Sequence, residues 1–323
     1  AQTENQTGYT VSFLLLNKPE GDLTYELNVT IPQQLYQYYQ IQNHALFSLS
    51  DFKKFVTPYA MKPIADRLWQ IYDNREDFTN GVLMLVHQIT YKEIVPGKYP
   101  VETLVTGYGD CDLFAFIAAS ILEAGGIPTV LLYYKEELHM EIGVDIGTPP
   151  TEARVDTFNV KYQNVSYYIG ECTGSKWRTG WRIGETPLKY QNSTVEVITL
   201  EDSEQTSIGQ VSAIIGELDP SNITLQVSSS LALENQPIAI SGQILPQVAN
   251  ENVTLQAQIG NGGWSIIGTV QSSTEGYYTY SWIPPTTGAV RVQANWEGTT
   301  QLNGASSMQE NIFVMPLYLL VLI

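Results

Sequence analysis

The stretch Tyr108-Gly109-Asp110-Cys111-Asp112-Leu113 runs directly into an apolar segment over residues 114–124. A glycine turn, then a cysteine, then an apolar helix places the thiol at a helix N-terminus. The unpaired N–H groups and the dipole at that end favour negative charge, so they stabilise a thiolate. The pattern predicts that Cys111 is a free nucleophile with a lowered pKa.

Two later segments supply partners for this thiol. Residues 137–144 alternate apolar and polar like a half-buried strand, with His139, Glu141 and Asp145 on one face. A second strand is expected over residues 165–173, and it contains Glu171. Neighbouring strands can present a base beside an orienting carboxylate, so Cys111, His139 and Glu171 form a candidate catalytic triad.

Other residues compete for these roles. Asp145 and Asp156 are the rivals of Glu171 as the orienting acid, and His44 and His87 are expected to be structural. The order nucleophile helix, base strand, acid strand favours Glu171.

The two cysteines, Cys111 and Cys172, leave a disulfide between them as the alternative to a reactive thiol. Adjacent residues of a strand point to opposite faces, which argues against that pairing if Glu171 faces the site.

Several motifs before and after the cysteine follow one order: a proline-led segment, the Gly-Asp-Cys-Asp turn, a closing Gly-Ile-Pro, the histidine, a Tyr-Ile-Gly-Glu-Cys-Thr strand and a Trp-Arg-Ile-Gly-Glu-Thr-Pro segment. They occupy residues 99–104, 109–112, 126–128, 139, 168–173 and 181–187. On these motifs the chain, over about residues 55–190, resembles the transglutaminase-like domains of archaea and bacteria. It departs from that family at Leu113, where a second acidic residue is more usual, and at Cys172, where threonine is often found.

The resemblance implies an α+β transglutaminase-like (papain-like) fold and acyl-transfer chemistry without a cofactor. Cys111 would attack an amide carbonyl, His139 would protonate the leaving amine, and Glu171 would orient the imidazole. Tyr108 is a weaker candidate for stabilising the oxyanion together with the Cys111 backbone N–H. The spacing of histidines, cysteines and acids indicates no metal site.

The charge of the chain limits its partners. The 323 residues carry a net charge of −17, and residues 190–323 contain one basic residue, Arg291, against 11 acidic ones. No basic stripe exists to meet phosphates, which excludes nucleic acid as a partner.

An extracellular protein or peptide is the expected substrate.

Features at several places predict export to the cell surface. The chain begins at Ala1, as a mature protein does after removal of a signal peptide. It has an excess of N-glycosylation triplets, at Asn5, Asn28, Asn164, Asn192, Asn222 and Asn252.

Residues 312–323 are apolar but shorter than the ~20 residues that span a bilayer. They are interpreted as the start of a C-terminal membrane anchor, and the alternatives are a last buried strand or a tail packed on an envelope or self-assembly partner.

The pattern along the chain predicts five parts: a β-rich start (1–50), the transglutaminase-like domain (51–200), a linker (201–220), a β-sandwich (221–313) and the apolar tail (314–323). The sandwich resembles immunoglobulin-like surface modules through residues 275–278, Trp282, residues 284–285 and Gly288.

Two functions remain open at this point. The first is a surface-anchored cysteine acyl-transferase or protease that acts on peptide or glutamine amides. The second is a structural or adhesive envelope protein that uses the transglutaminase-like fold as a scaffold without catalysis.

Overall fold

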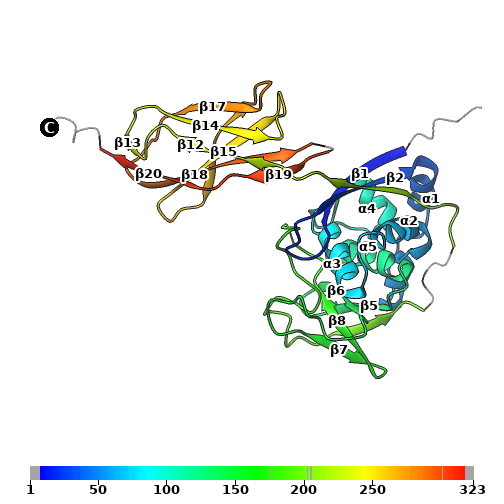
Figure 1. Cartoon of the computed structure of the whole chain (residues 1–323). Coiled ribbons are helices and arrows are strands. Elements are labelled where there is room, and N and C mark those ends of the chain that lie inside the picture. Colours follow the sequence, from blue (N-terminus) through cyan, green and yellow to red (C-terminus); the bar gives the residue numbers. More distant parts are fainter. Residues whose placement is uncertain (1–7, 175, 202, 204–205, 300, 317–323) are drawn as a thin grey trace, which may run out of the picture. The chain divides into compact units, whose positions relative to one another are not determined.

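The computed structural model describes residues 8–316, apart from residues 175, 202, 204, 205 and 300 (Figure 1). The chain divides into two compact units, residues 1–217 and residues 218–323. Each unit buries an apolar core of its own.

The first unit combines short helices with two main sheets. Its helices are α1 (Gln33–Gln40), η1 (Leu49–Phe55), α2 (Pro58–Leu68), α3 (Arg75–Val86), α4 (Pro100–Thr106) and α5 (Cys111–Ala124). One sheet has the order β1-β2-β10, from β1 (Gly8–Leu16), β2 (Thr24–Pro32) and β10 (Ser212–Leu218). The other has the order β7-β8-β6-β5-β9, from β5 (Thr129–Tyr134), β6 (His139–Val144), β7 (Asn159–Tyr162), β8 (Val165–Gly170) and β9 (Glu196–Thr199). A short parallel pair joins β3 (Thr90–Tyr91) to β4 (Tyr108–Gly109).

Helix α5 is the centre of the first unit. Residues 113–122 are buried on every side of the helix, which contacts α2, α3, α4, β5 and β6 (Figure 1). Asp110 caps its start, because its carboxylate accepts the Leu113 N–H at 3.4 Å. The helix ends before Gly126, whose φ of 74° suits glycine. The cysteine at the first position of α5 is therefore held on a rigid, fully packed element.

The predicted fold class is wrong. An α+β transglutaminase-like (papain-like) domain before an all-β sandwich was expected, but the structure is mostly β, with 38% strand and 19% helix. The helices are short, from seven residues in α4 to 14 in α5.

Two local expectations also fail in this unit. The segment after β2, part of the predicted β-rich start (1–50), forms helix α1 because its Leu35 and Tyr39 repeat at helical spacing and are both buried. The segment 201–220, expected to be a linker, contains β10, which joins the β1-β2 sheet.

The second unit is a β-sandwich. One sheet contains β11 (Asn222–Ile223), β12 (Gln226–Val227), β14 (Ile238–Leu245) and β17 (Tyr277–Trp282). The other contains β13 (Leu231–Leu233), β15 (Asn252–Ile259), β16 (Trp264–Gln271), β18 (Gly288–Gly298), β19 (Asn303–Ser306) and β20 (Glu310–Met315). Alternate residues of the long strands, such as Val253, Leu255 and Ala257 of β15, are buried in the shared core.

The apolar C-terminal run does not leave the sandwich where it was expected to. Ile312 and Val314 lie in β20, are 2% and 0% exposed, and belong to the core. Strand β20 lies between β13 and β18. Of the predicted tail, residues 317–323 lie outside the described residues, so the anchor stays a prediction. Within the described residues no helix is long and apolar enough to cross a membrane.

The glycosylation triplets differ in how accessible their asparagines are. Asn28 is half-buried, and its side-chain amide is engaged by Ser12 and Glu26. Asn5 lies outside the described residues. The exposed asparagines are Asn164, Asn192, Asn222 and Asn252.

We expect the fragment 218–316 to unfold cooperatively as an isolated β protein and the fragment 218–309 to lose most of its stability. The shorter fragment lacks β20, and burying Ile312 and Val314 contributes ~1.5–3 kcal/mol each. Circular dichroism during urea unfolding measures both fragments. Equal unfolding midpoints would show that the last strand is dispensable.

Candidate active site

The Cys111 sulfur lies in a nearly closed environment at the start of α5. The residue is 7% exposed. Its thiol donates toward the Asp112 carboxylate at 3.5 Å and the Leu138 carbonyl oxygen at 4.0 Å. The Met140 backbone N–H donates to the sulfur. The sulfur therefore contacts the backbone on both sides of His139.

The backbone conformation of Leu138 directs its carbonyl oxygen toward the Cys111 sulfur. Its φ is 48°, in the left-handed region that residues other than glycine rarely occupy. The side chain is exposed, so apolar packing does not hold it there. The strained residue ends the turn into β6 and directs its carbonyl group toward the thiol, a placement typical of functional sites.

His139 and Glu171 form a buried hydrogen bond. The imidazole Nε2 lies 2.9 Å from Glu171 Oε2, and the two side chains are 8% and 0% exposed. The other carboxylate oxygen, Oε1, accepts the backbone N–H and the hydroxyl group of Thr173, each at 2.7 Å. Burial alone would raise the pKa of Glu171, but the hydrogen bonds from His139 and Thr173 outweigh it and lower the pKa. An ionised Glu171 accepts the Nε2 proton and leaves Nδ1 with its lone pair.

The predicted low pKa of Cys111 is wrong, although the cysteine is free. Burial raises the pKa of the thiol to about 12, and the carboxylates of Asp112 and Asp110 act in the same direction. Desolvation of the thiolate thus exceeds the stabilisation expected from a helix N-terminus. Cys111 rests as a neutral thiol.

A second carboxylate lies beside the pair. The antiparallel register pairs Ile142 with Gly170, and its continuation sets Glu141 opposite Glu171. Both carboxylates are completely buried. Burial, followed by the nearby charge of Glu171, raises the pKa of Glu141 to about 8. Glu141 Oε1 accepts the Thr186 hydroxyl at 2.7 Å, and the Tyr134 hydroxyl group also interacts with this carboxyl group. Among the described residues, Oε2 has no partner within 3.5 Å.

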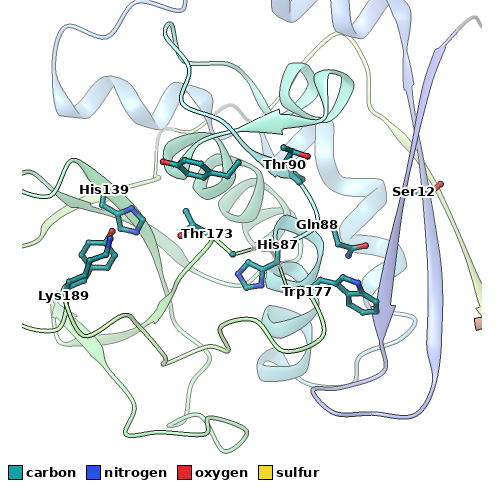
Figure 2. Close-up of a pocket in the computed structure, with 12 residues that line it drawn as sticks. Ser12, His87, Gln88, Thr90, His139, Thr173, Trp177 and Lys189 are labelled. Atoms are coloured by element: carbon teal, nitrogen blue, oxygen red, sulfur yellow. The ribbon is translucent and has the colours of Figure 1, made fainter. Parts of the chain in front are cut away.

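An open cavity of about 860 Å³ reaches the imidazole. Figure 2 shows His139 and Lys189 on one side of it and Trp177 and Gln88 on the other. The Tyr190 ring stacks on the imidazole with centroids 4.2 Å apart and fixes its plane. Cys111 does not line this cavity, so the cavity reaches the imidazole but not the sulfur.

Tyr108, predicted to help form an oxyanion hole, lies in a different cavity, with His44 and Glu102. The ammonium groups of Lys92 and Lys98 lie 4.5 and 4.4 Å from its ring centroid. Sequence reasoning missed Tyr91, which lines the cavity at His139 and whose pKa is raised mainly by burial.

The competing residues are engaged elsewhere. The Asp145 carboxylate accepts the Gly147 N–H at 2.9 Å, and Asp156 is exposed. His44 pairs with Glu102 at 2.7 Å. His87 is buried, and its Nε2 donates to the Glu171 carbonyl oxygen at 2.9 Å, so this histidine supports the backbone of the orienting acid.

The second cysteine is also accounted for. Cys172 is free and fully buried, and its thiol donates toward the Gly170 carbonyl oxygen at 3.6 Å. No disulfide joins it to Cys111.

No protein-family model and no curated protein matches the chain. Among solved structures, a C-terminal intimin fragment in complex with the intimin-binding domain of its translocated receptor is 19% identical, with a TM-score of 0.23. The match covers 29% of this chain and 33% of that one, so it spans about a third of the fragment. The D0-D1 domain of intimin is 13% identical, covering 54% of this chain and 89% of that one, with a TM-score of 0.23.

The CARDB domain of a Pyrococcus furiosus protein is 14% identical over 30% of this chain and 98% of that one, with a TM-score of 0.22. At these similarities a function has to rest on the site alone.

We expect Asp112→Asn to lower the pKa of Cys111 and to speed its alkylation by iodoacetamide at pH 8. The substitution removes a negative charge that destabilises the thiolate, and less charge repulsion leaves more thiolate at a given pH. Mass spectrometry of the labelled thiol measures the rate in a Cys172→Ser background. An unchanged or slower rate would show that the Asp112 charge does not control this thiol.

Proposed function

We propose that this protein is a surface protein that performs cysteine-dependent acyl transfer on peptide or glutamine amides, with Cys111 as nucleophile, His139 as base and Glu171 as orienting acid. One observation carries the proposal. His139 Nε2 bonds a buried Glu171 at 2.9 Å while the Cys111 sulfur contacts the residues on either side of His139.

The raised pKa of Cys111 favours general-base catalysis over a preformed thiolate–imidazolium pair. As the sulfur forms its bond to the amide carbonyl carbon, Nδ1 of His139 takes the thiol proton. The imidazolium is stabilised by Glu171. It then gives the proton to the amine nitrogen as the C–N bond breaks, which leaves a thioester on Cys111.

The thioester is resolved by a second nucleophile. Water attack with His139 as base yields a carboxylic acid, whereas attack by a primary amine yields a new amide, and either restores the thiol. The cavity beside His139 is open to solvent and lined by Trp177, Tyr190 and Lys189. An aromatic and polar lining of this kind suits a peptide segment more than a small apolar molecule.

A second candidate is a structural or adhesive surface protein without catalysis. Two observations favour it: the Cys111 thiol has a pKa of about 12, and Cys111 does not line the cavity that reaches His139. On this proposal the His139–Glu171 bond serves to hold β6 against the end of β8.

Labelling of Cys111 distinguishes the two candidates. We expect a peptide carrying an amide-mimicking electrophile to modify the full chain once, at Cys111. His139→Ala should slow the labelling by about 10²–10⁴-fold, the usual contribution of a general base. Intact-mass and peptide mass spectrometry measure the rate and the position.

Cys172→Ser is the matched control, because it removes the other thiol and should leave the rate unchanged. Circular dichroism checks that each variant folds. If wild type and His139→Ala react equally slowly, Cys111 is not activated and the non-catalytic candidate is favoured.

A further inference from the structure

The buried surroundings of His139 contain one carboxyl group more than the proposed triad needs. Glu141 and Glu171 are both 0% exposed and lie on opposed positions of β6 and the end of β8. Like charges at such positions repel, and a buried carboxylate needs a proton or a cation beside it. No cationic side chain within ion-pair distance offsets Glu141 in the described part of the chain.

The same three side chains have the donor atoms and spacing of a metal site. One ligand atom each from His139, Glu141 and Glu171 lies within 4.8 Å of the others. Independently, Glu141 Oε2 is buried and has no hydrogen-bond partner within 3.5 Å among the described residues, although the Tyr134 hydroxyl group interacts with the same carboxyl group. An imidazole nitrogen with two carboxylate oxygens suits Zn²⁺ and similar divalent transition ions, since Mg²⁺ and Ca²⁺ prefer oxygen alone.

We propose that His139 Nε2, Glu141 and Glu171 form a Zn²⁺-class binding site that switches off the base of the proposed triad. Zinc–nitrogen and zinc–oxygen bonds are about 2.0–2.2 Å, so the 2.9 Å separation of Nε2 and Glu171 Oε2 opens by a few tenths of an ångström around the ion. His139 lines the open cavity and the two carboxyl groups do not, so the ion would enter past the imidazole.

Binding at Nε2 changes what the other ring nitrogen does. The ion replaces the proton on Nε2, and a neutral imidazole then carries its proton on Nδ1. A protonated Nδ1 cannot accept the Cys111 proton. The inference that the ion switches off His139 as a base rests on the proposed function, whereas the inference of the metal site itself does not.

Titration calorimetry with zinc chloride on the chelator-treated full chain tests the site. We expect one zinc ion per chain in wild type and in Cys111→Ser, and binding at least about tenfold weaker in Glu141→Gln. His139→Gln provides a second ligand variant if Glu141→Gln fails to fold. His44→Gln is the matched control, because it alters the other histidine–glutamate pair and should leave binding unchanged.

Three results would overturn the site: no saturable binding to wild type, equal affinity in Glu141→Gln and wild type, or loss of binding in Cys111→Ser, which would assign the ion to the thiol. Co²⁺ substitution gives an independent readout. We expect the visible spectrum of a tetrahedral site without a thiolate charge-transfer band, and such a band would contradict the ligand set.

Alkylation of Cys111 with and without zinc tests the silencing. We expect zinc to slow labelling by at least about tenfold and a chelator to restore it. Labelling that is unaffected by bound zinc overturns the switch. If labelling without zinc does not depend on His139, the proposed function fails, but zinc binding to Cys111→Ser still supports the site.

Discussion

The hydrogen bond between His139 and Glu171 is shielded from water, and the arrangement of the site depends on that shielding. A carboxylate with no exposure stays ionised only because His139 and Thr173 donate to it. The same burial away from water raises the pKa of Cys111 to about 12 and the pKa of Glu141 to about 8. The exclusion of water therefore keeps the Cys111 thiol and the Glu141 carboxyl group protonated, whereas at Glu171 the hydrogen bonds outweigh it.

Helix α5 and the sheet that packs against it exclude water from the site. The helix is buried all round, so the thiol at its first residue is held among packed side chains. The antiparallel pairing of β6 with β8 then brings His139, Glu141 and Glu171 to one place. A site built on a central helix and two neighbouring strands has little freedom to rearrange, so its reactivity is set mainly by proton positions.

The sequence predicts much of the candidate site but not its electrostatics. The glycine turn before Cys111 and the alternation around His139 indicate where a thiol and an imidazole lie. The opposition of Glu141 and Glu171 follows from strand register, which single-strand patterns do not specify. The direction of the Cys111 pKa shift is also not predicted, because a helix terminus can be recognised in the sequence whereas the depth of burial cannot. Strand β10 and the burial of Val314 were missed for a similar reason: long-range pairing decides both.

The central claim is that His139 holds its proton on Nε2, toward Glu171, and keeps Nδ1 free to act as a base. Nitrogen-15 NMR of the histidine rings in the metal-free full chain at neutral pH tests it most directly, with His44→Gln and His87→Gln used for assignment. The account predicts a protonated, hydrogen-bonded Nε2 and an unprotonated Nδ1 for His139, with the Nε2 signal shifted in Glu171→Gln. A His139 ring protonated on Nδ1 alone would contradict it.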